Sequence, residues 1–234
     1  MIRLLVLGWL CGLSASAWAQ TRSQVYGSEL DRQTMTAFLR ADMGWNTYDS
    51  KTVESKETRS STTFMAGAFA GERRNVGMVF SSNENNVPYS LNDSRVNAAF
   101  RDVKLKARFG WVYPTIAASL TEMRVERSGA TLANLYSSGV GAGAGVELPL
   151  HDRIVVYGEG MMFRPSVVKD RTDNNVDLGQ RNEFDVGASV DLTDKILDLM
   201  VGYRVRSYSL SLNGTEQDEL TSGAYAGLRL GLYF

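Results

Sequence analysis

Apolar and polar residues alternate along most of the chain after residue 33. In the last eleven residues every even position from Ala224 to Phe234 is apolar, whereas the odd positions carry Tyr, Gly, Arg, Gly and Tyr. Similar alternation surrounds Trp45, Lys104 and Arg204. A period of two residues is that of a β-strand whose two faces meet different surroundings. The pattern predicts an all-β protein.

Ten segments show this pattern well enough to be predicted as strands. They lie at roughly 34–47, 60–71, 75–83, 97–111, 114–127, 137–149, 153–165, 182–193, 196–211 and 219–234. Short and long breaks alternate between them, which is typical of outer-membrane barrels with short periplasmic turns and longer external loops. An even number of strands would leave both chain ends in the periplasm. Segments 60–71 and 75–83 are the weakest, so eight strands is the alternative.

The direction in which the apolar face points decides the class of barrel. Lipid contacts the apolar face of a membrane barrel and the lumen takes the polar face, whereas a soluble lipocalin-like barrel has the reverse arrangement. A row of alternating glycines from Gly139 to Gly145, the terminal Phe234, and aromatic residues such as Phe163 and Tyr208 near strand ends favour the membrane version. We therefore predict an antiparallel up-and-down transmembrane β-barrel, with the soluble barrel as the alternative.

The first nineteen residues have the features of a cleaved signal peptide. A short basic start precedes an apolar run from Leu4 to Leu13, and the small residues Ala17 and Ala19 flank Trp18 as signal peptidase requires. Cleavage is expected after Ala19. This predicts a signal peptide at 1–19, a periplasmic N-terminal segment at 20–33 and a barrel at 34–234. The single cysteine, Cys11, would be removed with the signal, which excludes disulfides from the mature protein.

Composition adds mainly exclusions. Basic and acidic residues nearly cancel, 25 against 26, which does not favour a nucleic-acid partner. A mean hydropathy of −0.19 is too polar for a bundle of membrane helices. The single histidine, His151, falls in a predicted short turn, whereas a Ser-His-acid mechanism needs an imidazole beside its nucleophile. We therefore expect no enzymatic activity, no cofactor and no metal site; an outer-membrane hydrolase is the disfavoured alternative.

The alternation also predicts which charged residues enter the lumen. Side chains nearly fill a barrel this narrow, so buried charges must be paired. The prediction is an ion-pair network in the lumen made of Arg40, Asp42, Lys104, Arg108, Glu122, Arg124, Glu147, Glu159, Asp185, Asp198, Arg204, Arg206 and Arg229. Lys106 and Arg164 are expected to point inward as well. A narrow path for small solutes is the alternative to a plugged lumen.

The run from Gly139 to Gly160, in which a glycine-alternating strand and a short turn with Asp152 precede a strand bearing Glu159, resembles the OmpA-type and opacity-type outer-membrane barrels. The closing residues Leu230, Leu232, Tyr233 and Phe234 resemble the signal read by the outer-membrane assembly machinery. The resemblance covers roughly the last hundred residues. It implies a compartment and an architecture, and it leaves the function open because the family spans structural, adhesive and ligand-binding barrels. Typical members have eight strands, whereas ten are predicted here.

These observations lead to an expected role and expected partners. We expect a non-enzymatic barrel of the outer membrane of a Gram-negative bacterium, with a structural or surface-interaction role, which includes a role as a subunit of an envelope complex. The alternative is a narrow porin-like channel. Expected partners are outer-membrane lipid and lipopolysaccharide, the barrel-assembly machinery, and an envelope protein bound through the loops or residues 20–33. Lipopolysaccharide phosphates would meet the loop cations Lys51, Lys56, Arg59 and Arg95.

Overall fold

The structure is a computed structural model that describes residues 35–50, 53–70, 75–87, 94–127, 130–170, 176–193, 196–212 and 215–233. The predicted signal peptide, the predicted segment 20–33 and the terminal Phe234 lie outside these residues. Among the described residues, no helix is long and apolar enough to cross a membrane.

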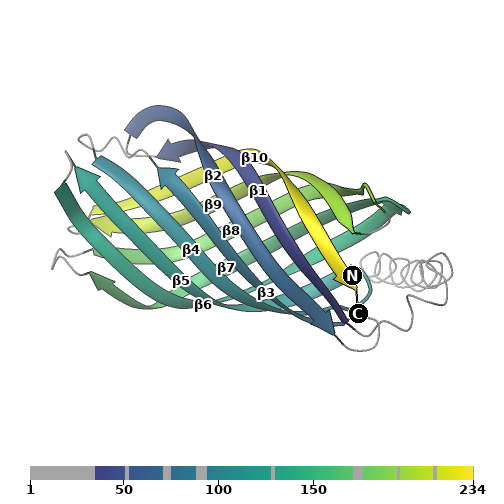
Figure 1. The fold of residues 1–234 in the computed structure, drawn as a ribbon. Coiled ribbons are helices and arrows are strands. Elements are labelled where there is room, and N and C mark those ends of the chain that lie inside the picture. Colours follow the sequence, from purple (N-terminus) through teal and green to yellow (C-terminus); the bar gives the residue numbers. More distant parts are fainter. Residues whose placement is uncertain are drawn as a thin grey trace, which may run out of the picture.

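Ten antiparallel strands form a closed barrel (Figure 1). They are β1 (Met35–Ser50), β2 (Val53–Ala70), β3 (Val76–Val87), β4 (Ser94–Ala107), β5 (Val112–Arg127), β6 (Ala130–His151), β7 (Ile154–Asp170), β8 (Val176–Asp191), β9 (Leu197–Leu212) and β10 (Thr215–Tyr233). Each strand pairs with its neighbours in the chain, and β1 pairs with β10 to close the ring. The prediction of ten strands is confirmed, including the two weakest segments, which form β2 and β3.

The barrel is apolar outside and polar inside. Leu39 and Met43 on β1 are 45% and 56% exposed, whereas Arg40 and Asp42 between them are buried. The same arrangement, with apolar residues outside and charged residues inside, is found on β4, where Val103 and Leu105 are exposed and Asp102 and Lys104 are buried. Water cannot be the solvent of such an outer surface, because exposing large contiguous apolar patches to water is unfavourable. Lipid outside and a polar interior define an outer-membrane β-barrel, so the membrane prediction is confirmed.

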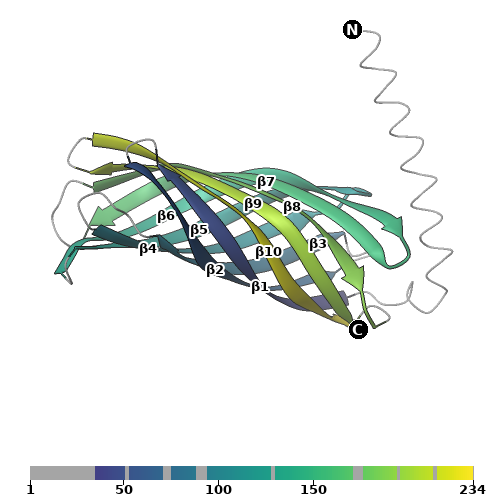
Figure 2. The same ribbon diagram turned by 90° about the horizontal axis from the view of Figure 1, so that it is seen from above.

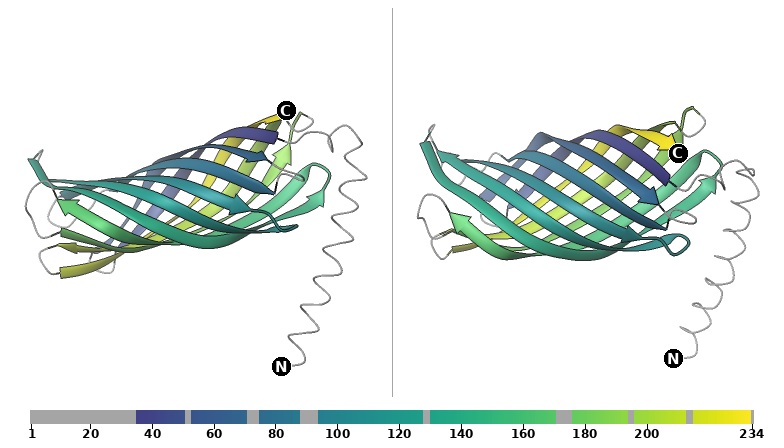
Figure 3. Two further views of the ribbon diagram at one scale, coloured as in Figure 1. Left: turned by 90° about the horizontal axis from the view of Figure 1, so that it is seen from below. Right: turned by 60° about the horizontal axis from the view of Figure 1, so that its bottom comes forward.

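One end of the barrel holds the start of β1 and the end of β10, and we call it the near end; the opposite end is the far end (Figure 2). Outward apolar residues concentrate toward the near end, and we call the zone that they form around the barrel the apolar belt. On β5, for example, Ile116 and Leu120 are exposed, and Glu122 and Arg124 follow them toward the far end. The strands thus continue beyond the apolar belt. Figure 3 shows that the β5–β6 hairpin reaches furthest at the far end.

The predicted pattern of long and short breaks is wrong. Segments expected to be long loops, such as 48–59 and 127–137, belong largely to strands: β1 ends at Ser50, β2 begins at Val53, and β6 begins at Ala130. The alternation of apolar and polar residues, from which the strand ends were predicted, stops where the outward face is no longer apolar. Ladder hydrogen bonds do not require an apolar face, so the strands extend past that point as paired but polar ribbons.

The glycine row of β6 has a packing role. A Cβ at Gly145 would lie 2.3 Å from the ring of Tyr113, and one at Gly141 would lie 2.5 Å from the ring of Phe163. Both rings are buried inside the barrel. The glycines therefore leave room for large lumen side chains of the two neighbouring strands.

Candidate functional site

The lumen is the densest collection of charged side chains in the described residues, and its two signs balance. Eight cations point inward: Arg40, Lys104, Lys106, Arg108, Arg181, Arg204, Arg206 and Arg229. Eight anions accompany them: Asp42, Asp102, Glu147, Glu159, Glu183, Asp185, Asp198 and Glu219. The interior is thus close to neutral, which is the arrangement that buried charge requires.

The near cluster consists of Lys104, Lys106 and Glu159. The two ammonium groups, from neighbouring inward positions on β4, share one carboxylate on β7: Lys104 Nζ lies 3.5 Å from Glu159 Oε1 and Lys106 Nζ lies 2.9 Å from Glu159 Oε2. Lys106 also lies 4.4 Å from the ring centroid of Tyr113. Closer to the near end, Arg108 pairs with Glu147 at 2.7 Å.

The central cluster consists of Arg40, Asp42, Asp185 and Arg204. The Arg204 guanidinium bridges two carboxylates, at 3.3 Å from Asp42 Oδ1 and 2.9 Å from Asp185 Oδ2, and Arg40 Nε lies 2.9 Å from Asp42 Oδ2. The Tyr225 hydroxyl donates a hydrogen bond to Asp185. These contacts join β1, β8, β9 and β10, so the cluster ties together the side of the barrel where the ring closes.

The far cluster consists of Asp102, Arg181, Glu183 and Arg206. Arg181 Nη2 lies 2.6 Å from Asp102 Oδ1, and Arg206 Nε lies 2.6 Å from Glu183 Oε1. Both guanidinium groups also pack on the ring of Phe100, at 4.6 and 4.4 Å from its centroid. Planar guanidinium groups can stack on rings and pair with carboxylates at the same time, which allows dense packing of charge.

Contacts at the level of the far cluster cross the full width of the barrel. Phe100 of β4 packs against Tyr208 of β9, with ring centroids 5.9 Å apart. These two strands lie opposite each other in the ring of ten. Arg206 of β9 donates a hydrogen bond of 2.6 Å to Asn83 of β3. The fully buried Met123 and Leu135 fill the adjoining space. Side chains therefore close the lumen in its far half.

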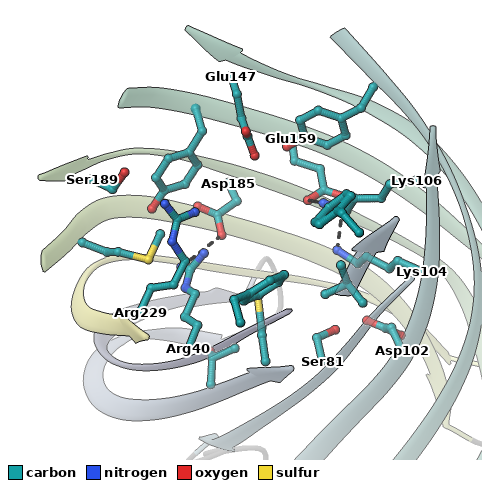
Figure 4. Close-up of a pocket in the computed structure, with 18 of the residues that line it drawn as sticks. Arg40, Ser81, Asp102, Lys104, Lys106, Glu147, Glu159, Asp185, Ser189 and Arg229 are labelled. Carbon is teal, nitrogen blue, oxygen red and sulfur yellow. Dashed lines mark hydrogen bonds and ion pairs between the residues drawn. The ribbon is translucent and has the colours of Figure 1, made fainter. Parts of the chain in front are cut away.

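A cavity of about 250 Å³ remains in the lumen on the near side of this closure. Residues of the near and central clusters line it, and so do residues at the near ends of strands, such as Thr36 and Gly231. Asp102, Glu183 and Arg206 of the far cluster also line it, whereas Arg181 and Phe100 do not. Figure 4 shows Lys104, Lys106 and Glu159 on one side of this space and Arg40 with Asp185 on the other. The cavity thus extends from the near end to the edge of the far cluster, and Arg181, Phe100 and Tyr208 lie outside its lining.

The structure places most, but not all, of the predicted network in the lumen. Glu122 and Arg124 are corrections: they lie on the outer surface, on the same face of β5 as the exposed Ile116 and Leu120. Arg164 also points outward, on β7. These residues follow the apolar belt toward the far end, where the outward face becomes polar, so charge there does not mark the lumen side.

Sequence reasoning also missed members of the network. Arg181 and Glu183 are central to the far cluster, but Arg181 preceded the predicted strand and was assigned to a loop. Phe163 and Tyr208, expected near the membrane interface, are buried in the lumen instead. The signal that could have found them is the period of two, had the strands been extended into the polar segments.

The features considered for catalysis lie away from this network. His151 is exposed in the turn between β6 and β7 at the near end, where the Arg153 backbone N–H donates to its Nδ1 at 3.4 Å. Among the described residues, no group of three or more His, Cys, Asp or Glu side chains has an arrangement that could hold a metal ion.

Comparisons with known proteins give similarity of fold only. No protein-family model matches the sequence, and no curated protein matches it either. Similar solved structures include Neisserial surface protein A, with 14% identity, 83% of this chain and 96% of that chain covered, and a TM-score of 0.40. The outer membrane protease OmpT from Escherichia coli has 9% identity, coverage of 86% and 94%, and a TM-score of 0.44. The β domain of the Bordetella autotransporter BrkA has 11% identity, coverage of 84% and 99%, and a TM-score of 0.41.

Proposed function

We propose that this chain is a non-conducting, non-catalytic barrel of the bacterial outer membrane, with the far end facing outward and a structural or surface-interaction role. The observation that carries the proposal is the contact between Phe100 and Tyr208, which joins opposite strands across the lumen. A pore needs a continuous aqueous path, and this level of the barrel is packed with side chains. The barrel then acts through its ends and its outer surface.

The orientation is supported by the distribution of apolar residues along the strands. The apolar belt lies toward the near end, whereas polar strand extensions project beyond it at the far end. Outer-membrane barrels have short periplasmic turns and larger extracellular parts. The far extensions, with the β5–β6 hairpin the longest of them, would be the surface offered to an external partner. The near end would face the periplasm, where a subunit of an envelope complex could bind through residues 20–33.

The absence of catalysis is proposed on the state of the lumen carboxylates. Glu183, Asp185 and Asp198 each lie against arginine in a close ion pair, and general acid–base work needs a group whose proton can be exchanged with a substrate. Membership of the OmpA-type or opacity-type group is part of the same proposal, supported by the glycine run of β6 and weakened by the ten strands.

A narrow channel is the second candidate, favoured by the cavity of about 250 Å³ in the near half of the lumen. Conductance across planar lipid bilayers separates the two. The purified, folded barrel should give no steady conductance. A variant that combines Phe100→Ala with Phe163→Ala should give measurable open events, because it removes two rings that pack on Arg181 in the closed level.

The matched control is Phe184→Ala, which removes an exposed outward ring and should leave the membrane non-conducting. A heat-induced shift in gel mobility reports that each variant has folded. Reproducible steady channels from the unmodified protein would overturn the closed-lumen proposal and favour the channel.

A further inference from the structure

The outer surface of β4–β7 carries a group of cations that the lumen network does not use. We call Arg101, Arg124, Arg164 and Lys169 the outer basic patch. All four are exposed and all point away from the lumen. Among the side chains that the structure describes there, two carboxylates lie near them: Glu122, at 3.5 Å from Arg101, and Glu84 on β3, whose partner residue Ala99 is two positions from Arg101. Because cations outnumber anions, the patch favours an anionic ligand.

A β-bulge creates part of this patch. Ser138 of β6 pairs with Val167 of β7, and the next residue, Gly139, pairs with Pro165, so Ser166 is an extra residue. In a regular strand positions 164 and 169 would face opposite sides, because their separation is odd. The bulge reverses the alternation, so both Arg164 and Lys169 point outward. Bulges re-aim side chains in this way, and proline suits them because it has no N–H to donate.

The patch borders a groove with a polar side and an apolar side. The apolar part of its lining consists of Leu120 and Val167, which are 60% and 48% exposed. The polar part consists of Arg101, Thr121, Glu122, Tyr136, Ser137, Ser138 and Lys169. The Tyr136 hydroxyl donates a 2.9 Å hydrogen bond to Glu122. The Arg101 side chain is 45% exposed, so its guanidinium is accessible from outside.

The groove lies where the apolar belt ends. Going toward the far end, Leu105 and Val103 precede Arg101 on β4, and Ile116 and Leu120 precede Glu122 on β5. Cations on the lipid face are costly at the bilayer midplane and nearly free of cost at the interface. The order of residues therefore places the patch at the level of lipid headgroups, with the apolar part of the groove beside the acyl chains.

We propose that this groove binds a phosphate-bearing lipid of the outward leaflet, of the lipid A type. Its phosphate would lie against Arg101 and Lys169, and an acyl chain would lie against Leu120 and Val167. Two phosphates on one headgroup suit a patch in which four cations are spread over three strands, β4, β5 and β7. The site is on the barrel wall, and it is distinct from the loop cations expected to meet lipopolysaccharide. It rests on the proposed orientation with the far end outward.

Lipid titration of the folded full-length barrel in neutral micelles tests the site, with bound lipid counted by native mass spectrometry. The probe is lipid A that carries both phosphates. Each surface cation contributes about fivefold to the affinity for an anionic lipid, so Arg101→Gln should weaken binding about fivefold and the double variant Arg101→Gln with Lys169→Gln about 30-fold. Arg153→Gln is the control, because it removes an exposed arginine from the near-end turn and should leave binding unchanged.

Three outcomes would overturn the proposal. The first is equal binding of lipid A by the unmodified barrel and the double variant. The second is displacement of lipid A by millimolar inorganic phosphate, which would indicate a site for free phosphate. The third is a preference for phosphatidylglycerol over lipid A, which would place the patch in the inner leaflet. Conductance of the double variant should remain absent, so a failure of this proposal is distinguishable from a failure of the closed-lumen proposal.

Discussion

The two halves of the lumen handle buried charge differently. In the near half, Lys104 and Lys106 share the single carboxylate of Glu159 beside a cavity. In the far half, Arg181 and Arg206 pair with carboxylates and pack on the ring of Phe100. Arg206 reaches the edge of the cavity, whereas Arg181 and Phe100 do not line it. Both halves carry charge at similar density, so charge by itself does not explain why only one of them is closed.

The difference lies in the shape and hydration of the cationic group. An ammonium is a compact, strongly hydrated charge, and two of them around one carboxylate favour a water-accessible space. A guanidinium is planar and weakly hydrated, and it stacks on aromatic rings while it pairs with carboxylates. In the far half two guanidinium groups pack on Phe100, and this ring meets Tyr208 across the lumen. Arg108 and Arg204 also stack on rings but line the cavity, so the closure requires the bulk of Phe100 and Tyr208 as well. The comparison predicts that the same kind of substitution will have a larger effect in the far half.

The largest effect is expected from Arg181→Ala. This change removes the partner of the buried Asp102 and the group that lies between the rings of Phe100 and Phe163. Breaking a buried pair from one side costs about 3–5 kcal/mol, because the remaining charge stays in a poorly hydrated place. Urea unfolding of the folded barrel, followed by tryptophan fluorescence, measures the change in the free energy of unfolding.

Asp102→Asn in the same variant supplies the control. It removes the carboxylate charge of Asp102 that Arg181→Ala leaves unpaired, so part of the lost stability should return. The double-mutant cycle should give a coupling energy above about 1 kcal/mol, the order of magnitude found for residues in direct contact. A loss below about 1 kcal/mol for Arg181→Ala would show that water reaches the far cluster, contrary to the closed-lumen proposal.

A smaller effect is expected in the near half from Glu159→Gln. The neutral amide no longer compensates Lys104 and Lys106, but the adjacent cavity can hydrate their ammonium groups. The loss should be about 1–2 kcal/mol, as for one charge-assisted hydrogen bond. Glu183→Gln makes the same chemical change at the edge of the cavity, but it leaves two ring-stacked guanidinium groups, those of Arg181 and Arg206, without their shared carboxylate, and it should cost about 3 kcal/mol or more. Equal losses for the two variants in urea unfolding would remove the difference between the halves.

The number of strands could be predicted from the sequence. Which side chains point into the lumen could also be predicted wherever the outward face of a strand is apolar along its whole length. On β1 and β9, for example, Leu39 and Val201 lie outside while Arg40 and Arg204 lie inside. Lipid contact imposes a strict period of two on these segments, and one sequence is enough to detect it. Beyond the apolar belt both faces are polar, so the period loses its contrast; this is why Glu122 and Arg124 were assigned to the wrong side.

Two further features were not predictable from the local sequence. The bulge at Ser166 reverses the facing of β7, and nothing but Pro165 marks it in advance. The closure of the lumen depends on Phe100 and Tyr208, which are 108 positions apart and meet only because their strands lie opposite each other in the ring. Contacts across a barrel follow from strand number and register together, and register was the quantity that the alternation pattern did not provide.

The smallest effect is expected at the near rim, from Arg229→Gln. The Arg229 side chain is 33% exposed, and its guanidinium pairs with Asp198 at 2.5 Å. Water can replace the lost partner there, so urea unfolding should show a change of about 0–1 kcal/mol, and the difference should shrink further in 1 M salt because the pair is screened. Asp198→Asn should behave alike. A loss above about 2 kcal/mol that does not depend on salt would mean that the near rim is as dry as the far cluster, and the distinction between a hydrated and a packed half of the lumen would then fail.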